Sequence, residues 1–138
     1  MKPINVVVTG ASGKMGQEVI RALCREPEMR VVGAVDQKTT GDSLTLPDGS
    51  GKVPFSSDLD YILTSCKPNV LVDFTLAAAT RAAVPVAARK GVNMVIGTTG
   101  LTGSDLDEMA RLAGKHKIGI VVASNFALGA VMMMHLAK

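Results

Sequence analysis

The sequence predicts an α/β fold in which a doubly wound parallel sheet of about six strands carries helices on both faces. Three observations predict this fold. Short apolar runs alternate with segments of helical period along the 138 residues. The runs are continuous and rich in β-branched residues, which is typical of parallel strands that are buried on both faces. Apolar residues make up 47% of the chain and charged residues 20%, which suits one globular domain with its own core.

The first part of the chain predicts two strands, one helix and a long loop. Residues 4–9 form the first strand, and residues 14–25 follow as a helix with apolar side chains at helical spacing. A Glu-Pro-Glu sequence at 26–28 ends this helix, and residues 29–35 form the second strand. Residues 36–52 are rich in Gly, Thr, Asp and Ser and contain Pro-Asp-Gly, so we expect a loop with a turn.

The middle of the chain continues the alternation. Residues 53–55 predict a short strand, and Ser57 or Asp58 is expected to cap a helix that runs to about Cys66. Residues 70–74 predict the fourth strand, which Lys-Pro-Asn introduces.

An Ala-rich helix follows at residues 77–90. Pro85 lies inside it and should kink or restart the helix, and Gly91 should end it. Residues 93–96 predict the fifth strand, and the sequence GTTG follows at 97–100.

The last elements are a helix, a strand and a second helix. Ser104, with Asp107 three residues later, is expected to cap a helix that ends near His116. Residues 118–123 predict the sixth strand, and residues 128–138 have helical period.

Three glycines lie between the first strand and its helix: Gly10, Gly13 and Gly16. Ligands of such folds bind at the carboxyl ends of the strands, and a diphosphate held at a helix N-terminus needs bare backbone amides. We expect Gly10 to make the tight turn, Gly13 to let the phosphates approach and Gly16 to let the helix lie against the strand. Asp36 ends the second strand 20 residues after Gly16, where an acid would bind the adenosine ribose hydroxyls. Together these features predict a dinucleotide site.

The sequence leaves the choice of nicotinamide cofactor open. The carboxylate of Asp36 would repel a 2′-phosphate, which favours NADH, whereas Lys14 and Lys38 would attract one. Gln37 is neutral. A P-loop is excluded, because only two residues separate its first glycines and Met15 stands where Ser or Thr is required.

Composition argues against several other kinds of site. Aromatic residues make up 3% of the chain, the formal charge is +3, and no basic cluster is interleaved with aromatic residues, so nucleic-acid binding is not expected. The two cysteines and two histidines have no zinc-site spacing, and free thiols with no signal peptide predict a cytoplasmic protein. Residues 118–137 are long enough to span a membrane, but Ser124, Asn125 and His135 interrupt them, so no membrane span is expected.

Four motifs occur in order and together resemble one enzyme family. They are GASGKMG at 10–16, VDFT at 72–75, VIGTTG at 95–100 and ASNFALGA at 123–130. In order and spacing the whole chain resembles 4-hydroxy-tetrahydrodipicolinate reductase, also called dihydrodipicolinate reductase, an enzyme of lysine and diaminopimelate biosynthesis. The resemblance implies that residues 1–138 form a Rossmann-like domain that binds NADPH or NADH for reduction of a small dicarboxylate substrate.

Members of that family are about twice as long and are commonly homotetramers. Their second domain binds the substrate and carries the tetramer contacts and the group that handles the proton, and its motifs do not occur in this sequence. The resemblance therefore implies that this chain supplies the cofactor-binding half, contains no catalytic residue and is inactive alone.

The resemblance also assigns site residues. The residues that match the family's cofactor-binding segments are Gly10, Ala11, Ser12, Gly13, Lys14, Met15, Asp36, Phe74, Thr75, Gly97, Thr98, Thr99, Ala123, Ser124, Asn125 and Phe126. The glycine pattern and the residues beside Asp36 add Gly16, Gln37 and Lys38 to the expected cofactor-binding residues, which include Thr99. Of these, Thr99 is also expected to bind the substrate. Many members have Arg where Gln37 stands, so this chain departs from the pattern that favours NADPH.

The sequence lacks the catalytic residues that two other classes of oxidoreductase require. A short-chain reductase needs Tyr-x-x-x-Lys, but Ser65 stands four residues after Tyr61. A semialdehyde dehydrogenase needs an activated cysteine, and neither Cys24 nor Cys66 has a histidine nearby in the sequence. A stand-alone NAD(P)-binding or redox-sensing module without catalysis stays open, and the sequence beyond Lys138 would distinguish it from a reductase.

Overall fold

The computed structural model describes residues 2–39 and 41–122, in which strands and helices alternate. The strands are β1 (Ile4–Thr9), β2 (Met29–Val35), β3 (Ser43–Thr45), β4 (Lys52–Ser56), β5 (Val70–Asp73), β6 (Asn93–Ile96) and β7 (Ile120–Val122). The helices are α1 (Lys14–Cys24), α2 (Leu59–Cys66), α3 (Ala77–Arg89) and α4 (Gly103–His116).

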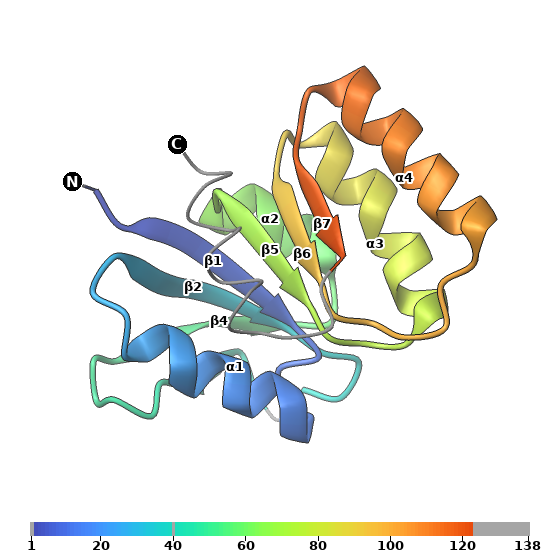
Figure 1. The fold of residues 1–138 in the computed structure, drawn as a ribbon. Coiled ribbons are helices and arrows are strands. Elements are labelled where there is room, and N and C mark those ends of the chain that lie inside the picture. The colour runs from blue at the N-terminus through green and yellow to red at the C-terminus, as the bar shows by residue number, and fades with distance from the viewer. Residues whose placement is uncertain (1, 40, 123–138) are drawn as a thin grey trace.

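The strands form one sheet in the order β3-β4-β2-β1-β5-β6-β7 (Figure 1). All neighbouring strands are parallel except β3, which runs antiparallel to β4. From the central strand β1 the chain first builds outward through β2 and β4, and then crosses to β5 and continues to β7. This reversal beside β1 opens a crevice at the carboxyl ends of the strands, where ligands of such sheets bind.

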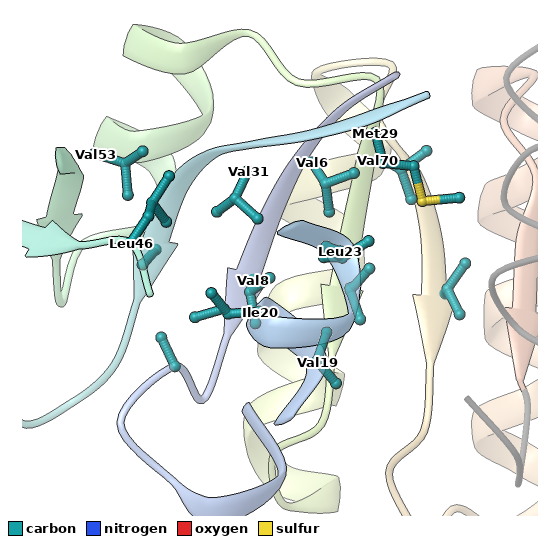
Figure 2. Packing of buried hydrophobic residues seen from close by; sticks show 14 of the residues in the cluster. Val6, Val8, Val19, Ile20, Leu23, Met29, Val31, Leu46, Val53 and Val70 are labelled. Carbon is teal, nitrogen blue, oxygen red and sulfur yellow. The ribbon is translucent and has the colours of Figure 1, made fainter. Parts of the chain in front are cut away.

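Helices cover both faces of the sheet, as the sequence predicts. Along β1, the side chains of Val6 and Val8 face α1, whereas Val7 faces the opposite layer. Figure 2 shows Ile20 and Leu23 of α1 against Val6 and Val8. The opposite core contains buried residues from three helices, and these are Ile62 and Leu63 of α2, Ala83, Val84, Ala87 and Ala88 of α3, and Met109 and Leu112 of α4. Burial of these apolar side chains on both faces is the main force that holds the layers together.

Strand β3 is the one strand of the described chain that the sequence analysis missed. It lies in residues 36–52, which were expected to form only a loop with a turn. Its three residues, Ser-Leu-Thr, are too few to show a strand period, and they pair because the turn brings them beside β4. The turn contains Gly49, whose φ is +77°, and Asp48, whose carboxylate accepts hydrogen bonds from the amide and hydroxyl of Ser50. Side-chain chemistry of the turn therefore creates a strand that has little propensity of its own.

Two expectations about helices also need correction. Helix α4 is capped by Thr102, not by Ser104: the Thr102 hydroxyl accepts from the amide of Asp105, whose carboxylate accepts from the amide of Thr102. Helix α3 runs unbroken from Ala77 to Arg89 with Pro85 inside it, so the expected restart does not occur, and the alternative, a kink, stays a prediction. In contrast, Asp58 caps α2 and Gly91, with φ of +70°, follows the end of α3, both as predicted.

Residues 123–138 lie outside the described part, so the expected last helix and the expected contacts of Ala123, Ser124, Asn125 and Phe126 stay predictions. None of the helices in residues 2–39 and 41–122 combines the length and the apolar character that crossing a membrane requires. Both cysteines are free and partly buried, and burial raises the pKa of each thiol, with Asp48 contributing to the shift at Cys24.

Candidate dinucleotide-binding site

The glycine loop connects the end of β1 to the start of α1. Gly10 has a φ of +74°, a conformation that side chains disfavour, and a Cβ there would lie 3.1 Å from both the carbonyl oxygen of Phe74 and Cγ2 of Thr75. The amides of Gly10 and Ala11 both donate to the carbonyl oxygen of Val35, at 2.9 and 3.2 Å. Gly10 therefore makes the tight turn that the sequence predicts and ties β1 to β2.

Gly16 permits the close approach of α1 to this turn. A Cβ on Gly16 would lie 1.9 Å from the carbonyl oxygen of Gly10 and 3.0 Å from Cα of Ala11. No side chain fits this space, which confirms the predicted packing role. Gly13 differs, since a Cβ on it would lie 3.4 Å from the Gly10 carbonyl oxygen and would meet no other atom closely.

The N-terminus of α1 presents bare backbone amides. Gly13 is the N-cap, and no side chain caps the helix. Among the described residues, no acceptor bonds the amides of Lys14, Met15 or Gly16, which are the first three of the helix. Unpaired amides and the positive end of the helix dipole together favour an anion at this position.

Asp36 faces the glycine loop from the end of β2. Its Oδ2 accepts from the amide of Ser12 at 2.8 Å, and its Oδ1 accepts from the amide of Lys38 at 3.3 Å. The hydroxyl of Ser12 also donates to the carbonyl oxygen of Lys38, at 3.4 Å. Each carboxylate oxygen can accept more than one hydrogen bond, so Asp36 keeps capacity for a ligand hydroxyl while it joins the two loops. Its neighbour Gln37 is exposed, as are Lys38 and Lys14.

The loops after β5 and β6 meet beside the glycine loop. The amide of Gly97 donates to the carbonyl oxygen of Asp73 at 2.8 Å. A Cβ on Gly97 would lie 2.1 Å from Cε1 of Phe74, so the Phe74 ring covers the position where a side chain would stand. In Figure 1 the arrowheads of β1, β5 and β6 point to the same edge of the sheet, where α1 also begins.

A buried polar chain also links these two loops. Oδ1 of Asp73 accepts from the amide of Thr75 at 3.0 Å and from its hydroxyl at 2.6 Å. The hydroxyl of Thr75 lies 3.4 Å from that of Thr80, which donates to the hydroxyl of Thr98 at 2.8 Å. Asp73 and Thr80 are fully buried, and Oδ2 of Asp73 has no hydrogen-bond partner in the described part of the chain.

The sequence analysis missed Asp73 and Thr80. Asp73 belongs to the VDFT motif, and a carboxylate that ends a buried strand was a signal for it. Thr80 lies in an Ala-rich helix without any pattern that marks it. Thr99 and Gly100 are exposed, and Gly100 has a φ of +84°.

A cleft of about 890 Å³ runs along this edge of the sheet. Six of the sequence-predicted residues line it: Gly10, Gly13, Asp36, Gln37, Phe74 and Thr75. Small residues of α3 form an apolar wall, and these are Ala78, Ala79, Ala82, Ala83 and Val86. Gly97, Thr98 and Thr99 do not line the cleft. Gly97 lies next to it through Phe74, and Thr98 through Thr80 and Thr75. An apolar cleft with a few polar groups is typical of a small-molecule site.

A second cavity of about 540 Å³ lies between α3 and α4, away from the glycine loop. Its rim includes an ion pair in which Nε of Arg81 lies 2.8 Å from Oδ1 of Asp105. Hydrogen bonds from Arg81 and from the Thr102 amide hold the pKa of the Asp105 carboxyl well below its usual range. This cavity contains none of the residues predicted to bind the cofactor. In residues 2–39 and 41–122, no three His, Cys, Asp or Glu side chains are grouped so that they could hold a metal ion.

Comparison with known proteins identifies the family. The family model described as "Dihydrodipicolinate reductase, N-terminus" matches residues 4–126. The chain belongs to this family. The match confirms the family predicted from the four motifs and identifies the chain as its N-terminal part, which agrees with the observed α/β fold.

Individual members of the dihydrodipicolinate reductase family match along the chain. A 4-hydroxy-tetrahydrodipicolinate reductase of Dehalococcoides mccartyi (strain ATCC BAA-2266 / KCTC 15142 / 195) is 54% identical over 138 residues, which is 100% of this chain and 52% of that protein. One from Moorella thermoacetica (strain ATCC 39073 / JCM 9320) is 44% identical over 137 residues, 98% of this chain and 51% of that protein. The solved dipicolinate-bound dihydrodipicolinate reductase of Paenisporosarcina sp. TG-14 is 35% identical, with a TM-score of 0.77 over 96% of this chain and 51% of that one. The chain thus spans about half the length of the curated relatives it matches.

Proposed function

We propose that this chain is the cofactor-binding half of a 4-hydroxy-tetrahydrodipicolinate reductase, an NAD(P)H-dependent oxidoreductase of lysine and diaminopimelate biosynthesis. The observation that carries the proposal is the glycine loop: Gly10 and Gly13 line a cleft that Asp36 borders, and the first amides of α1, directly after Gly13, have no acceptor among the described residues. Family membership and the names of the relatives support the reaction.

The residues at the cleft fit a dinucleotide. Unpaired amides at Lys14, Met15 and Gly16 would bind the diphosphate, and the side-chain-free surface at Gly13 would let it approach. Asp36 would accept hydrogen bonds from the adenosine ribose hydroxyls. The loops of Phe74 and Gly97 would hold the nicotinamide end.

When bound, the reduced nicotinamide supplies a hydride to the substrate. The protein would contribute orientation: the loops after β5 and β6, which the Gly97–Asp73 bond joins, would fix where the cofactor's inner end lies. Thr99, exposed on the GTTG loop, would donate to a substrate carboxylate. A dicarboxylate substrate is supported by the relative solved with dipicolinate bound.

The remaining parts of the proposal concern the whole protein. Groups that handle the proton and complete the substrate site would come from a second domain, as the length of the relatives supports. We further propose a homotetramer in the cytoplasm, where such biosynthetic enzymes act. Ala123, Ser124, Asn125 and Phe126 are proposed to close over the nicotinamide.

The activity is tested with the protein expressed from the complete reading frame that contains this chain. Substrate is generated enzymatically in the cuvette, and absorbance of NADH or NADPH is followed. We expect oxidation of the reduced cofactor only when the substrate is formed. Cofactor binding without any oxidation would contradict the reductase and support a binding module instead.

A binding experiment tests the loop itself. In calorimetry with the 138-residue chain, Gly13→Val should abolish measurable NADH binding, because its side chain would occupy the surface proposed for the diphosphate. The fold should survive, since a Cβ at Gly13 is tolerated. Gly114→Ala, in open space on α4, is the matched control and should bind as the wild type does. Unchanged affinity of Gly13→Val would remove the loop from the site.

A further inference from the structure

We propose that Thr80 is a positioning residue, whose hydroxyl holds the loop of Thr75 and the loop of Thr98 at a fixed separation so that they accept the nicotinamide end of the cofactor. This inference rests on the proposed function. It starts from the row of polar contacts that runs from Asp73 through Thr75 and Thr80 to Thr98.

The donor and acceptor of the hydrogen bonds among these four side chains can be assigned. The hydroxyl of Thr75 donates to Oδ1 of Asp73 at 2.6 Å, which is shorter than its contact of 3.4 Å with the carbonyl oxygen of Leu76. Thr80 has one hydroxyl proton, which it donates to Thr98 at 2.8 Å, so it cannot donate to Thr75 as well, and the oxygens of Thr75 and Thr80 are in contact at 3.4 Å without a shared proton. The hydroxyl of Thr80 therefore bonds the loop of Thr98 and touches the loop of Thr75, which directly precedes α3.

The surroundings of the Thr80 hydroxyl offer it no other hydrogen-bond partner among the described residues. Thr80 is fully buried in the first turn of α3, and its neighbours on the buried face, including Ala83, Val84 and Ala87, are apolar. A threonine inside a helix commonly bonds the carbonyl four residues earlier, but among the described residues the Thr80 hydroxyl makes no such bond to Leu76. An apolar residue would satisfy packing here, so the hydroxyl is explained by its bond to Thr98 and its contact with Thr75.

The other links between the two loops lie closer to the strands. The Gly97 amide bonds the Asp73 carbonyl, and the Phe74 ring packs on Gly97. Thr80 adds a link one residue further along each loop, at Thr75 and Thr98. Without it, the ends of the loops would lose their common anchor while the base remained joined.

The test uses two variants of the full chain and two ligands. Thr80→Val removes the hydroxyl with little change in volume, and Thr80→Ser keeps the hydroxyl. NADH reports on the whole site, whereas ADP-ribose lacks the nicotinamide and reports on the diphosphate and adenosine parts. Affinities for both ligands are measured by calorimetry, and circular dichroism checks folding.

We expect Thr80→Val to bind NADH about tenfold more weakly, the loss typical of one buried hydrogen bond. Its affinity for ADP-ribose should stay within a factor of about two of the wild-type value, which is the usual scatter when a substitution and a binding site do not interact. Thr80→Ser should bind both ligands almost as the wild type does. Should Thr80→Val fail to fold, Thr98→Val removes the other end of the same bond and should give the same selective loss.

Equal losses for both ligands would overturn the proposal, because they would indicate a general structural role. Wild-type affinity for NADH in the Val variants, or a Ser variant as weak as Thr80→Val, would also overturn it. A wild-type chain that binds neither ligand would overturn the proposed function itself, which is a different result from these.

Discussion

The amide nitrogen of Ser12 lies 2.8 Å from Oδ2 of Asp36, so the glycine loop after β1 is joined directly to the end of β2. The bond connects the two segments that are proposed to hold the diphosphate and the adenosine ribose. In the proposed site, it would also place the Asp36 carboxylate where the 2′-phosphate of NADPH would lie.

Replacement of Asp36 should therefore change cofactor preference. We expect Asp36→Ala to lower affinity for NADH and to shift the NADH-to-NADPH affinity ratio toward NADPH by about tenfold, since hydrogen bonds to the ribose are lost and repulsion of the 2′-phosphate is removed. Titration of the chain with each cofactor measures the ratio. Asp42→Ala, an exposed acid in the following loop, is the control and should leave it unchanged. A ratio unaffected by Asp36→Ala would exclude Asp36 from the adenosine site.

Gly16 should be needed for stability as well as for binding. Its Cβ would lie 1.9 Å from the Gly10 carbonyl oxygen, so Gly16→Ala must push α1 away from the loop. We expect the free energy of unfolding to fall by about 2 kcal/mol or more. Urea denaturation followed by circular dichroism measures this change.

The control for this prediction is Gly114→Ala in α4, where an added Cβ meets nothing within 4 Å. Because alanine favours helix there, this variant should gain about 0.5–1 kcal/mol. Equal effects of the two substitutions would show that the close approach at Gly16 is not real.

The ion pair between Arg81 and Asp105 predicts a specific response to acid. Hydrogen bonds lower the pKa of the Asp105 carboxyl below the ordinary aspartate value of 3.8, so the ionised form of Asp105 stabilises the fold above that pH. This contribution is lost as the pH falls through the lowered pKa. The difference in stability between wild type and Asp105→Asn should therefore be constant near neutral pH and should shrink once the pH drops below about 4.

Chemical denaturation at several pH values measures this difference. Asp107→Asn, an exposed acid in the same helix, is the control and should differ little from wild type at any pH. If the Asp105→Asn difference did not change with pH, the ion pair would not contribute as the structure indicates.

The sequence predicted the central part of the site because its residue types leave few alternatives. Gly10 and Gly16 have no room for side chains. The order of strand, glycine loop and helix is enough to predict where these two glycines lie. The roles of Gly13 and Asp36 in binding stay predictions, although both residues line the same cleft.

The parts that the sequence could not predict depend on tertiary contacts. Thr102 and Ser104 each have an aspartate three residues later, so spacing alone did not choose between them. In the structure Asp105 also bonds Arg81 of α3, which favours the cap at Thr102. Thr80 was missed for the same reason, since its two partners lie on loops that only the fold brings together.

A crystal structure of the chain with NADH tests the central claim most directly. The account predicts the diphosphate within hydrogen-bond distance of the amides at the start of α1, next to Gly13, with the adenosine ribose beside Asp36. A diphosphate bound elsewhere on the protein, with these amides facing only solvent, would contradict it.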